Sequence, residues 1–458
     1  MNNAPLVVIN IVGLTPELVG SDTPNLLRLA NSGFIAPVSP ILPAVTCSAQ
    51  STILTGKLPR DHGIVGNGWY FRETAEIRFW LQNNSLVEGS KIWDRVRDEF
   101  PESKSNVHFW WYNMYSTAEL STTLRPIYPA DGRKIPALYS QPPRLERELQ
   151  AKHGKFPMFD FWGPKAGLPS SEWIAESAAT LFEKERPKLH LVYLPHLDYS
   201  FQRLGPSHPD TRKELRAIDK VAGRLIDRVQ SLGAEVVVLS EYGIEDVHTA
   251  IGINQVLREA GLITVRETLG WELLDPGASA AFAVCDHQVA HVYVRDSTQI
   301  SKVAALLRDV PGIEHVLQGD AIAAEGLDHP RSGELIAVAQ PGHWFHYYYW
   351  LEESKAPDFA RTVDIHRKPG YDPVELFLDP DRPFIKAHLV KTLAKKKLGF
   401  RYMMDVIPLR PGLVKGSHGR RTTDPGKGPV LIASSTVAAK DVFEMTQLHD
   451  FLLAQLRG

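Results

Sequence analysis

A chain of 458 residues, 43% of them hydrophobic, is long enough to form two or three domains around a large buried core. Its formal net charge of -2 gives no electrostatic case for binding nucleic acid or an anionic membrane surface. No apolar run approaches the roughly 20 residues that a membrane span needs, and two cysteines, Cys47 and Cys285, exclude a disulfide framework. We therefore expect a soluble, cytoplasmic protein with neither a nucleic-acid nor a membrane partner.

The first third of the chain predicts strand–helix alternation. Residues 6–12 form a β-branched run that is typical of a strand buried on both faces, and Thr23-Pro24 opens a helix that Gly33 ends. An apolar approach marked by proline then ends at Thr46, where a segment of small residues favours a helix closed by Gly56. Thr46 is thus expected beside the positive end of a helix, a position that suits an anion and a nucleophilic hydroxyl. The alternative is that Thr46 only caps the helix.

The middle of the chain continues the alternation. Buried strands are predicted at residues 106–111, 190–194 and 236–239, and helices at 171–182 and 214–232. The second of these strands leads into Asp198, and the third leads into Glu241 and Tyr242. In parallel sheets, functional side chains gather at the carboxyl ends of strands. Both acidic residues are therefore candidates for chemistry.

The composition changes near residue 270, and the predicted domains follow from this change. Short strands at residues 282–284, 291–294 and 334–339 surround a helix at 299–307, a pattern that indicates a small α+β cap. A last core strand is expected at 430–433 and a closing helix at 438–456. The fold class is therefore α/β, with a mostly parallel central sheet flanked by helices. The core would comprise residues 1–269 and 363–458, and the inserted cap residues 270–362.

Six motifs occur in a fixed order along the chain. They are x-G-L after the first strand, T-x-S-x-x-S-x-x-x-T-G, H-G-I-V-G-N-G, Y-L-x-x-x-D, L-S-x-x-G and G-S-H-G. This order resembles the nucleotide pyrophosphatase/phosphodiesterase and phosphonoacetate hydrolase branch of the alkaline phosphatase superfamily, from Leu6 to about Ala433. The resemblance implies an alkaline-phosphatase-like sheet domain with an inserted cap.

The resemblance also implies roles for individual residues. Thr46 matches a nucleophile that attacks phosphorus from between two zinc ions, and Asn67 matches the residue that holds a phosphoryl oxygen. The first metal position corresponds to Asp198, Gln202 and His418, where the family has aspartate, histidine and histidine. Gln202 is therefore a departure that replaces an imidazole with a neutral oxygen donor.

The second metal position departs further from the family. An aspartate and an Asp-His pair are expected there, and this chain has Val12, Glu241 and Tyr242. Glutamate keeps the carboxylate, and tyrosine could ligate if deprotonated, but valine offers no donor. Because oxygen-rich ligand sets suit magnesium or manganese better than zinc, we expect one divalent ion of any of these three metals. Its ligands would be Asp198 and His418, with Gln202 or Glu241.

Further histidines offer a relocated site as an alternative. His196 would share a strand face with Asp198, and His287 and His291 would share a face on a strand or a helix. His366 follows Asp364 by two residues. Such pairs are more often hydrogen-bonded parts of the structure than ligands.

Together the motifs predict a hydrolase or group-transfer enzyme that acts on a small phosphoester, phosphodiester or phosphonate. Thr46 would attack, and Asn67 would hold the oxyanion. Two alternatives stay open because of the altered ligands. One is a catalytically silent relative that binds or assembles, and the other is an altered enzyme that works without the two-zinc site.

Overall fold

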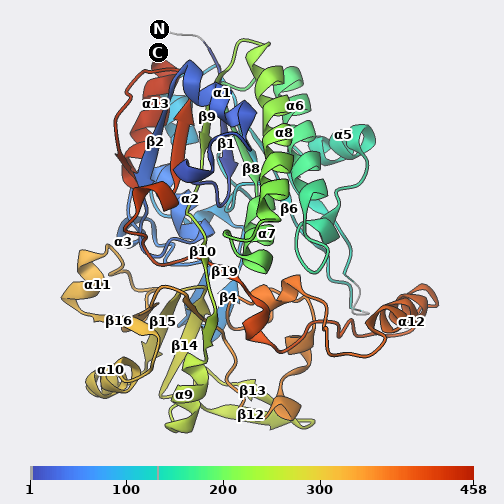
Figure 1. The fold of residues 1–458 in the computed structure, drawn as a ribbon, viewed down its shortest axis with the longest axis vertical. Coiled ribbons are helices and arrows are strands. Elements are labelled where there is room, and N and C mark those ends of the chain that lie inside the picture. Colours follow the sequence, from blue (N-terminus) through green and yellow to red (C-terminus); the bar gives the residue numbers. More distant parts are fainter. Residues whose placement is uncertain (1–3, 131–133) are drawn as a thin grey trace.

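The computed structural model describes residues 4–130 and 134–458 (Figure 1). A nine-stranded sheet forms its centre, in the order β21-β2-β20-β9-β1-β8-β5-β6-β7. Five neighbouring strands run parallel: β9 (Glu235–Leu239), β1 (Leu6–Ile11), β8 (Leu189–Leu194), β5 (Ser105–His108) and β6 (Leu120–Leu124). The outer strands are β20 (Val430–Ala433), β2 (Phe34–Ser39), β21 (Phe443–Glu444) and β7 (Leu138–Gln141). β20 and β7 run antiparallel to their neighbours. The predicted α/β fold with a mostly parallel sheet is confirmed.

Helices cover the central sheet in two groups. α1 (Pro24–Ser32), α6 (Leu168–Glu185) and α8 (Thr211–Gln230) pack together, and α13 (Leu448–Arg457) packs on α2 (Thr46–Thr55) and α4 (Ile92–Glu99). Every residue of β1 is buried, as its unbroken apolar run predicts for a strand covered on both faces. The sheet and these helices share the largest hydrophobic core of the protein.

A second sheet lies beyond the carboxyl ends of the parallel strands (Figure 1). Its antiparallel strands are β14 (Ala281–Asp286), β15 (Val289–Val294), β17 (Leu335–Ala339) and β16 (Ile313–Gln318), in that order. α10 (Ile300–Arg308) packs on this sheet, and α11 (Asp320–Ala324) lies beside β16. These elements match the strands and the helix predicted for residues 282–339. Asp286 ends β14, and His287 lies in the turn that leads to β15.

The remaining helices and strands lie outside the nine-stranded and the four-stranded sheet. No helix in the two described ranges is long and apolar enough to cross a bilayer. The helices are α3 (Pro59–His62), α5 (Arg144–His153), α7 (His196–Leu204), α9 (Ile253–Glu259) and α12 (Ile385–Lys397). The strands are β3 (Gly68–Phe71), β4 (Glu76–Phe79), β10 (Glu245–Asp246), β11 (Thr249–Ile251), β12 (Val265–Thr268), β13 (Trp271–Leu274), β18 (His343–Phe345) and β19 (Gly416–Ser417).

Two sequence predictions were wrong at their boundaries. The strand predicted for residues 106–111 ends at His108, because Phe109 takes a positive φ of 63° that a strand does not accommodate. The closing helix predicted for residues 438–456 begins only at Leu448. Ala438 has a φ of 54°, and β21 pairs with β2 before the helix starts.

Buried histidines make the stability of this fold depend on pH. Burial lowers the pKa of His190, the second residue of β8, to about 3, and it lowers that of His62 to about 3 as well. A histidine in the unfolded chain has a pKa near 6.5. As the pH falls below that value, the unfolded chain binds a proton at each of these histidines while the folded chain does not, so the unfolded state is stabilised. Each histidine should therefore cost about 2 kcal/mol of stability at pH 5 relative to pH 8.

We expect His190→Gln to reduce this acid destabilisation by about 2 kcal/mol, because glutamine cannot take the proton. Glutamine can still accept a hydrogen bond from Asn106, whose Nδ2 lies 2.9 Å from His190 Nδ1. Chemical denaturation at pH 5 and pH 8 measures the difference for both proteins. An unchanged pH dependence in the variant would show that His190 is not the group responsible.

Candidate active site

The candidate residues converge at the carboxyl ends of the parallel strands. Asp198 lies in the first turn of α7, directly after β8, and Glu241 and Tyr242 follow β9. Because β8 and β9 flank β1 in parallel, their carboxyl ends lie side by side. Thr46 begins α2, and His418 follows β19. Segments far apart in sequence therefore meet in one buried site.

Thr46 is the first residue of α2, and its hydroxyl faces the site. The N-cap of α2 is Val45, so the interpretation of Thr46 as the helix cap is wrong. Thr46 Oγ1 lies 3.0 Å from the Tyr242 hydroxyl oxygen instead. The side chain is held in a polar contact, and Thr46 is 4% exposed.

A continuous chain of hydrogen bonds runs through Thr46. The Tyr242 hydroxyl donates to Asp198 Oδ1 over 3.4 Å, so its oxygen is free to accept the Thr46 hydrogen. Gln202 Nε2 donates to Asp198 Oδ2 over 2.8 Å, and the Tyr371 hydroxyl donates to Gln202 Oε1 over 3.0 Å. Both oxygens of Asp198 thus accept hydrogen bonds from neutral groups.

Burial of this carboxyl group without a cationic partner sets its acidity. Burial raises the pKa of Asp198 to about 7, although the hydrogen bonds from Gln202 and Tyr242 oppose the shift. Burial also raises the pKa of Tyr242 well above its usual value. Near neutral pH a large share of Asp198 is therefore ionised and able to accept a proton, while Tyr242 stays a phenol.

Asn67 lies beside the amino terminus of α2. Its Oδ1 accepts from the Cys47 backbone N–H over 2.9 Å, and its Nδ2 donates to Asp286 Oδ1 over 3.0 Å. Its own backbone N–H donates to Asp286 Oδ2 over 2.7 Å. The turn of the second sheet therefore holds Asn67 next to Thr46. An amide carries two hydrogens, so one N–H of Asn67 stays available for an anion.

Amide groups fill the second metal position that the resemblance implies. Asn10 Nδ2 and Gln50 Nε2 donate to Glu241 Oε1 over 2.5 and 2.6 Å. Burial raises the pKa of Glu241 to about 8, against the effect of these two hydrogen bonds, so this carboxyl group is largely neutral at pH 7. Val12 is fully buried and offers no donor. This position therefore does not fit a second ion.

The first metal position has two suitable ligands. His418 Nδ1 lies 2.8 Å from the Ala44 carbonyl oxygen, and its buried Nε2 has no hydrogen-bond partner and lies 3.7 Å from Asp198 Oδ1. A ring held through Nδ1 with a free Nε2 is typical of metal-binding histidines. Within residues 4–130 and 134–458, however, no three His, Cys, Asp or Glu side chains are grouped to hold a metal ion. The two-zinc set does not fit, and one ion at Asp198 and His418 stays a prediction.

Only one of the four additional histidines joins the site. The His287 ring contacts the His418 ring, with centroids 3.7 Å apart and the two ring planes tilted by 36°. His196 lies 2.8 Å from Glu214 on α8. The expected shared face with Asp198 was wrong because this segment is a helix and not a strand. Backbone atoms contact both ring nitrogens of His291, and His366 contacts a backbone carbonyl.

Sequence reasoning missed four side chains that complete the site. Asn10 interrupts an otherwise apolar strand, which was a signal for a buried polar contact. Gln50 and Asp286 gave no signal of their own. Tyr371 stands in a P-G-Y-D-P stretch similar to a family motif, and its ring stacks on His287 with centroids 3.7 Å apart.

Comparison with known protein families gives one extensive match. The family described as type I phosphodiesterase / nucleotide pyrophosphatase matches residues 6–372. An uncharacterized pyrophosphatase/phosphodiesterase of Schizosaccharomyces pombe is 26% identical over 253 residues, which cover 52% of this chain and 44% of that protein. The mouse ectonucleotide pyrophosphatase/phosphodiesterase family member 1 is 25% identical over 53% of this chain and 24% of its own length. The match therefore spans less than half of either relative.

Solved structures share the fold over the full chain. Phosphonoacetate hydrolase from Sinorhizobium meliloti 1021, in complex with phosphonoacetate, aligns with a TM-score of 0.66 and 15% identity, covering 99% of this chain and 96% of that one. Murine ectonucleotide pyrophosphatase / phosphodiesterase 5, an inactive form in complex with AMP, aligns with a TM-score of 0.59 and 14% identity. That alignment covers 100% of this chain and 95% of that one. At these identities the likeness shows the fold alone.

The ligand geometry generates a prediction of metal content. Val12 offers no metal-ligand atom, and the Asn10 and Gln50 amides already hydrogen-bond to Glu241. The protein purified without chelator should therefore hold fewer than two divalent ions per chain. Elemental analysis by mass spectrometry checks this number. Two tightly bound ions, both lost in Asp198→Asn, would contradict it.

Proposed function

Since the chain belongs to the type I phosphodiesterase / nucleotide pyrophosphatase family, we propose that it hydrolyses or transfers the phosphorus group of a small substrate. The substrate class is a phosphoester, phosphodiester or phosphonate, and Thr46 is the nucleophile. The observation that carries this proposal is the 3.0 Å contact between the Thr46 and Tyr242 hydroxyls, continued from Tyr242 to Asp198.

The first step forms a bond between Thr46 Oγ1 and phosphorus and breaks the bond from phosphorus to the leaving group. The Thr46 proton moves to the Tyr242 oxygen, and Tyr242 passes its own proton to Asp198. The raised pKa of Asp198, about 7, makes it a suitable acceptor near neutral pH. Asp198 then returns a proton to the leaving group. Attack by water on the phosphorylated threonine, with the protons moving along the same path, restores the enzyme.

The remaining groups stabilise the negative charge that develops on phosphorus. The free N–H of the Asn67 amide and the amino terminus of α2 lie beside Thr46, where an anion is favoured. If a divalent ion is held by Asp198 and His418, it would offset this negative charge, and Asp198 would then serve as a ligand instead of as the proton acceptor. Two buried free thiols, Cys47 and Cys285, are compatible with the reducing cytoplasm that we propose as the location.

A second candidate function has its own supporting observation. The Cys47 N–H and one N–H of Asn67 are already paired inside the protein, and Thr46 and Asn67 are almost completely buried. A silent relative that binds a ligand or a partner would have this closed arrangement. In that case no phosphorus substrate would turn over.

Replacement of the nucleophile separates the two functions. Thr46→Ala should abolish turnover of an aryl phosphodiester and an aryl phosphonate, because the hydroxyl is consumed in the chemical step. Thr46→Ser, which keeps a hydroxyl, is the matched control and should retain activity. Thermal melting verifies that both variants fold. If the alanine variant works as well as the parent, Thr46 is not the nucleophile; if the parent itself is inert across the panel, the silent relative is favoured.

Removal of the proton path tests Tyr242. Tyr242→Phe should lower kcat about 100-fold, a typical loss for general base catalysis, because Thr46 can no longer pass its proton to Asp198. Tyr371→Phe is the control, since it removes a hydroxyl that touches Gln202 and not Thr46. Steady-state kinetics of both variants give the comparison. A larger effect of Tyr371→Phe than of Tyr242→Phe would refute the path.

A further inference from the structure

A helical arm stands away from both sheets. We define the arm as residues 379–406, which contain α12, and Figure 1 shows α12 at the far edge of the molecule. The two ends of the arm meet where the Asp379 backbone N–H donates to the Val406 carbonyl over 2.8 Å. The arm takes no part in the active site described above.

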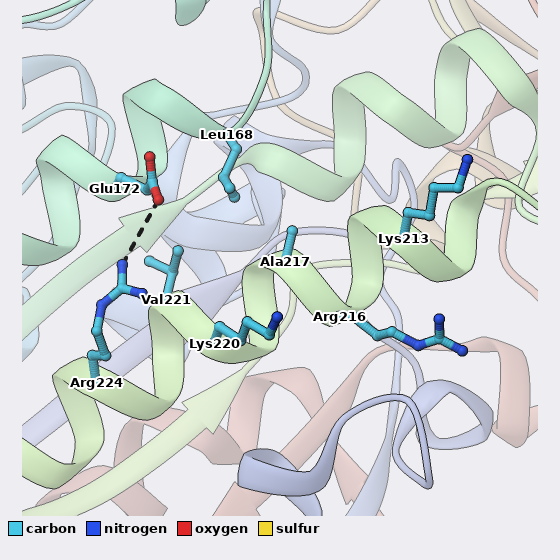
Figure 2. Close-up of a pocket in the computed structure, with 8 residues that line it drawn as sticks. All are labelled: Leu168, Glu172, Lys213, Arg216, Ala217, Lys220, Val221 and Arg224. Carbon is cyan, nitrogen blue, oxygen red and sulfur yellow. Dashed lines mark ion pairs between the residues drawn. The ribbon is translucent and has the colours of Figure 1, made fainter.

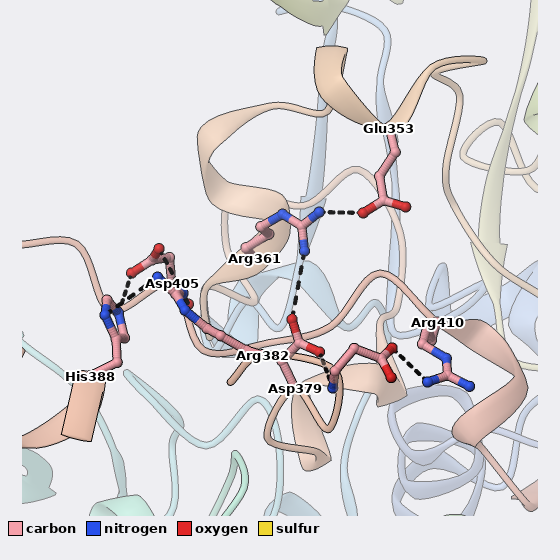
Figure 3. Close-up of polar contacts among 8 residues, drawn as sticks. Glu353, Arg361, Asp379, Arg382, His388, Asp405 and Arg410 are labelled. Carbon is pink, nitrogen blue, oxygen red and sulfur yellow. Dashed lines mark hydrogen bonds and ion pairs between the residues drawn. The ribbon is translucent and has the colours of Figure 1, made fainter. Parts of the chain in front are cut away.

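Ion pairs hold the root of the arm in place (Figure 3). Arg382 Nη1 and His388 Nε2 lie 2.9 and 2.8 Å from the carboxylate oxygens of Asp405. Arg410, in the body of the protein, lies 2.5 Å from Asp381. The carboxylates near the arm are therefore already paired with groups at its root.

The outer part of the arm carries only positive charge. Residues 384–404 contain six basic side chains and no acidic one. None of the six has an ion-pair partner among the residues that the structure describes. They are Lys386, Lys391, Lys395, Lys396, Lys397 and Arg401.

The same segment exposes large apolar side chains. Ile385 and Leu389 pack toward the body of the protein, which accounts for one face of α12. Met404 packs against the same cluster, but several large apolar side chains of the segment are exposed. Their exposed fractions are 86% for Phe384, 73% for Leu398, 66% for Val390 and 64% for Phe400.

A second basic helix face shows what distinguishes the arm. A groove is lined by Lys213, Arg216, Lys220 and Arg224 of α8, and the carboxylate of Glu172 lies among them (Figure 2). Arg224 lies 3.7 Å from Glu172, and Arg216 lies 2.7 Å from Asp22. No large apolar side chain of α8 is prominently exposed beside these charges. Of these two surfaces, the arm is the one that combines lysines lacking ion-pair partners with exposed phenylalanine, leucine and valine.

We propose that the arm docks the protein on an anionic phospholipid bilayer. Lysines attract the negative headgroups, and the exposed apolar side chains that lie among these lysines would enter the boundary between headgroups and acyl chains. A nucleic acid would satisfy the lysines but would leave Phe384, Val390 and Leu398 in water. The net charge of the whole chain, -2, is a sum over all residues and therefore does not indicate this local basic segment. The inference is independent of the proposed phosphorus chemistry.

Sedimentation with vesicles tests the proposal on the full chain. The protein should pellet with vesicles of 30% phosphatidylserine in phosphatidylcholine and remain in solution with phosphatidylcholine alone. Each lysine near the surface contributes about a fivefold gain in partitioning, so K391E/K395E/K397E should weaken binding at least 100-fold. V390S/L393S should also weaken it while leaving the charge unchanged. Thermal melting confirms that the variants fold.

Matched substitutions and a label make the test specific. K213E/R216E/K220E changes an equal number of charges on α8 and should leave vesicle binding intact. Because Cys47 and Cys285 are buried, an environment-sensitive dye can be attached at Leu398→Cys, or at Val442→Cys beside β21 as a control. Anionic vesicles should shift the emission only at position 398.

Four outcomes would overturn the proposal. They are no binding to anionic vesicles, equal binding to neutral vesicles, equal loss of binding in the α8 variant, and binding of a single-stranded oligonucleotide without binding of vesicles. A dye response at both positions would likewise show that the arm is not the docking surface.

Discussion

Two carboxyl groups are buried at the carboxyl ends of the parallel strands, and neutral donors are their direct hydrogen-bond partners. Asp198 accepts from Gln202 and Tyr242, and Glu241 accepts from Asn10 and Gln50. A buried carboxylate without a cation is costly, so burial raises the pKa of both groups toward or above neutrality. The chemistry of the site follows from this constraint, since a carboxyl group with a pKa near 7 can take and return a proton.

The rest of the site depends on contacts between the two sheets. Asp286, the last residue of β14, holds Asn67 beside Thr46, and His287 from the turn that follows packs against His418. Tyr371 reaches Gln202 from a loop that a buried Lys368 fixes through Glu375, with Nζ and Oε1 2.7 Å apart. The second sheet therefore contributes residues to the site. A change in how the sheets pack would move Asn67 and Tyr371 together.

Hydrogen-bonding side chains stand at the positions where the resemblance implies metal ligands. Tyr242 stands where an imidazole is expected, and its hydroxyl contacts both Thr46 and Asp198. Gln202 stands at another imidazole position, and its amide lies between Asp198 and Tyr371. Each replacement thus supplies a hydrogen bond where the resemblance implies a metal bond. This pattern favours a site whose polar groups are arranged by hydrogen bonds.

The sequence by itself determined the α/β fold and the order of most strands and helices, and the motifs it shares with the family singled out Thr46, Asn67, Asp198 and His418, which the structure brings together. These follow from hydrophobic periodicity and from motifs that are local in the chain. Its errors lay where tertiary contacts override local preference, as at Phe109 and before α13, where β21 pairs with β2. Only the tertiary structure decided that Asn10 and Gln50 donate hydrogen bonds to Glu241 and that Asp286 accepts hydrogen bonds from Asn67. Those pairs are 191 to 231 residues apart, and no local pattern encodes a hydrogen bond across such a separation.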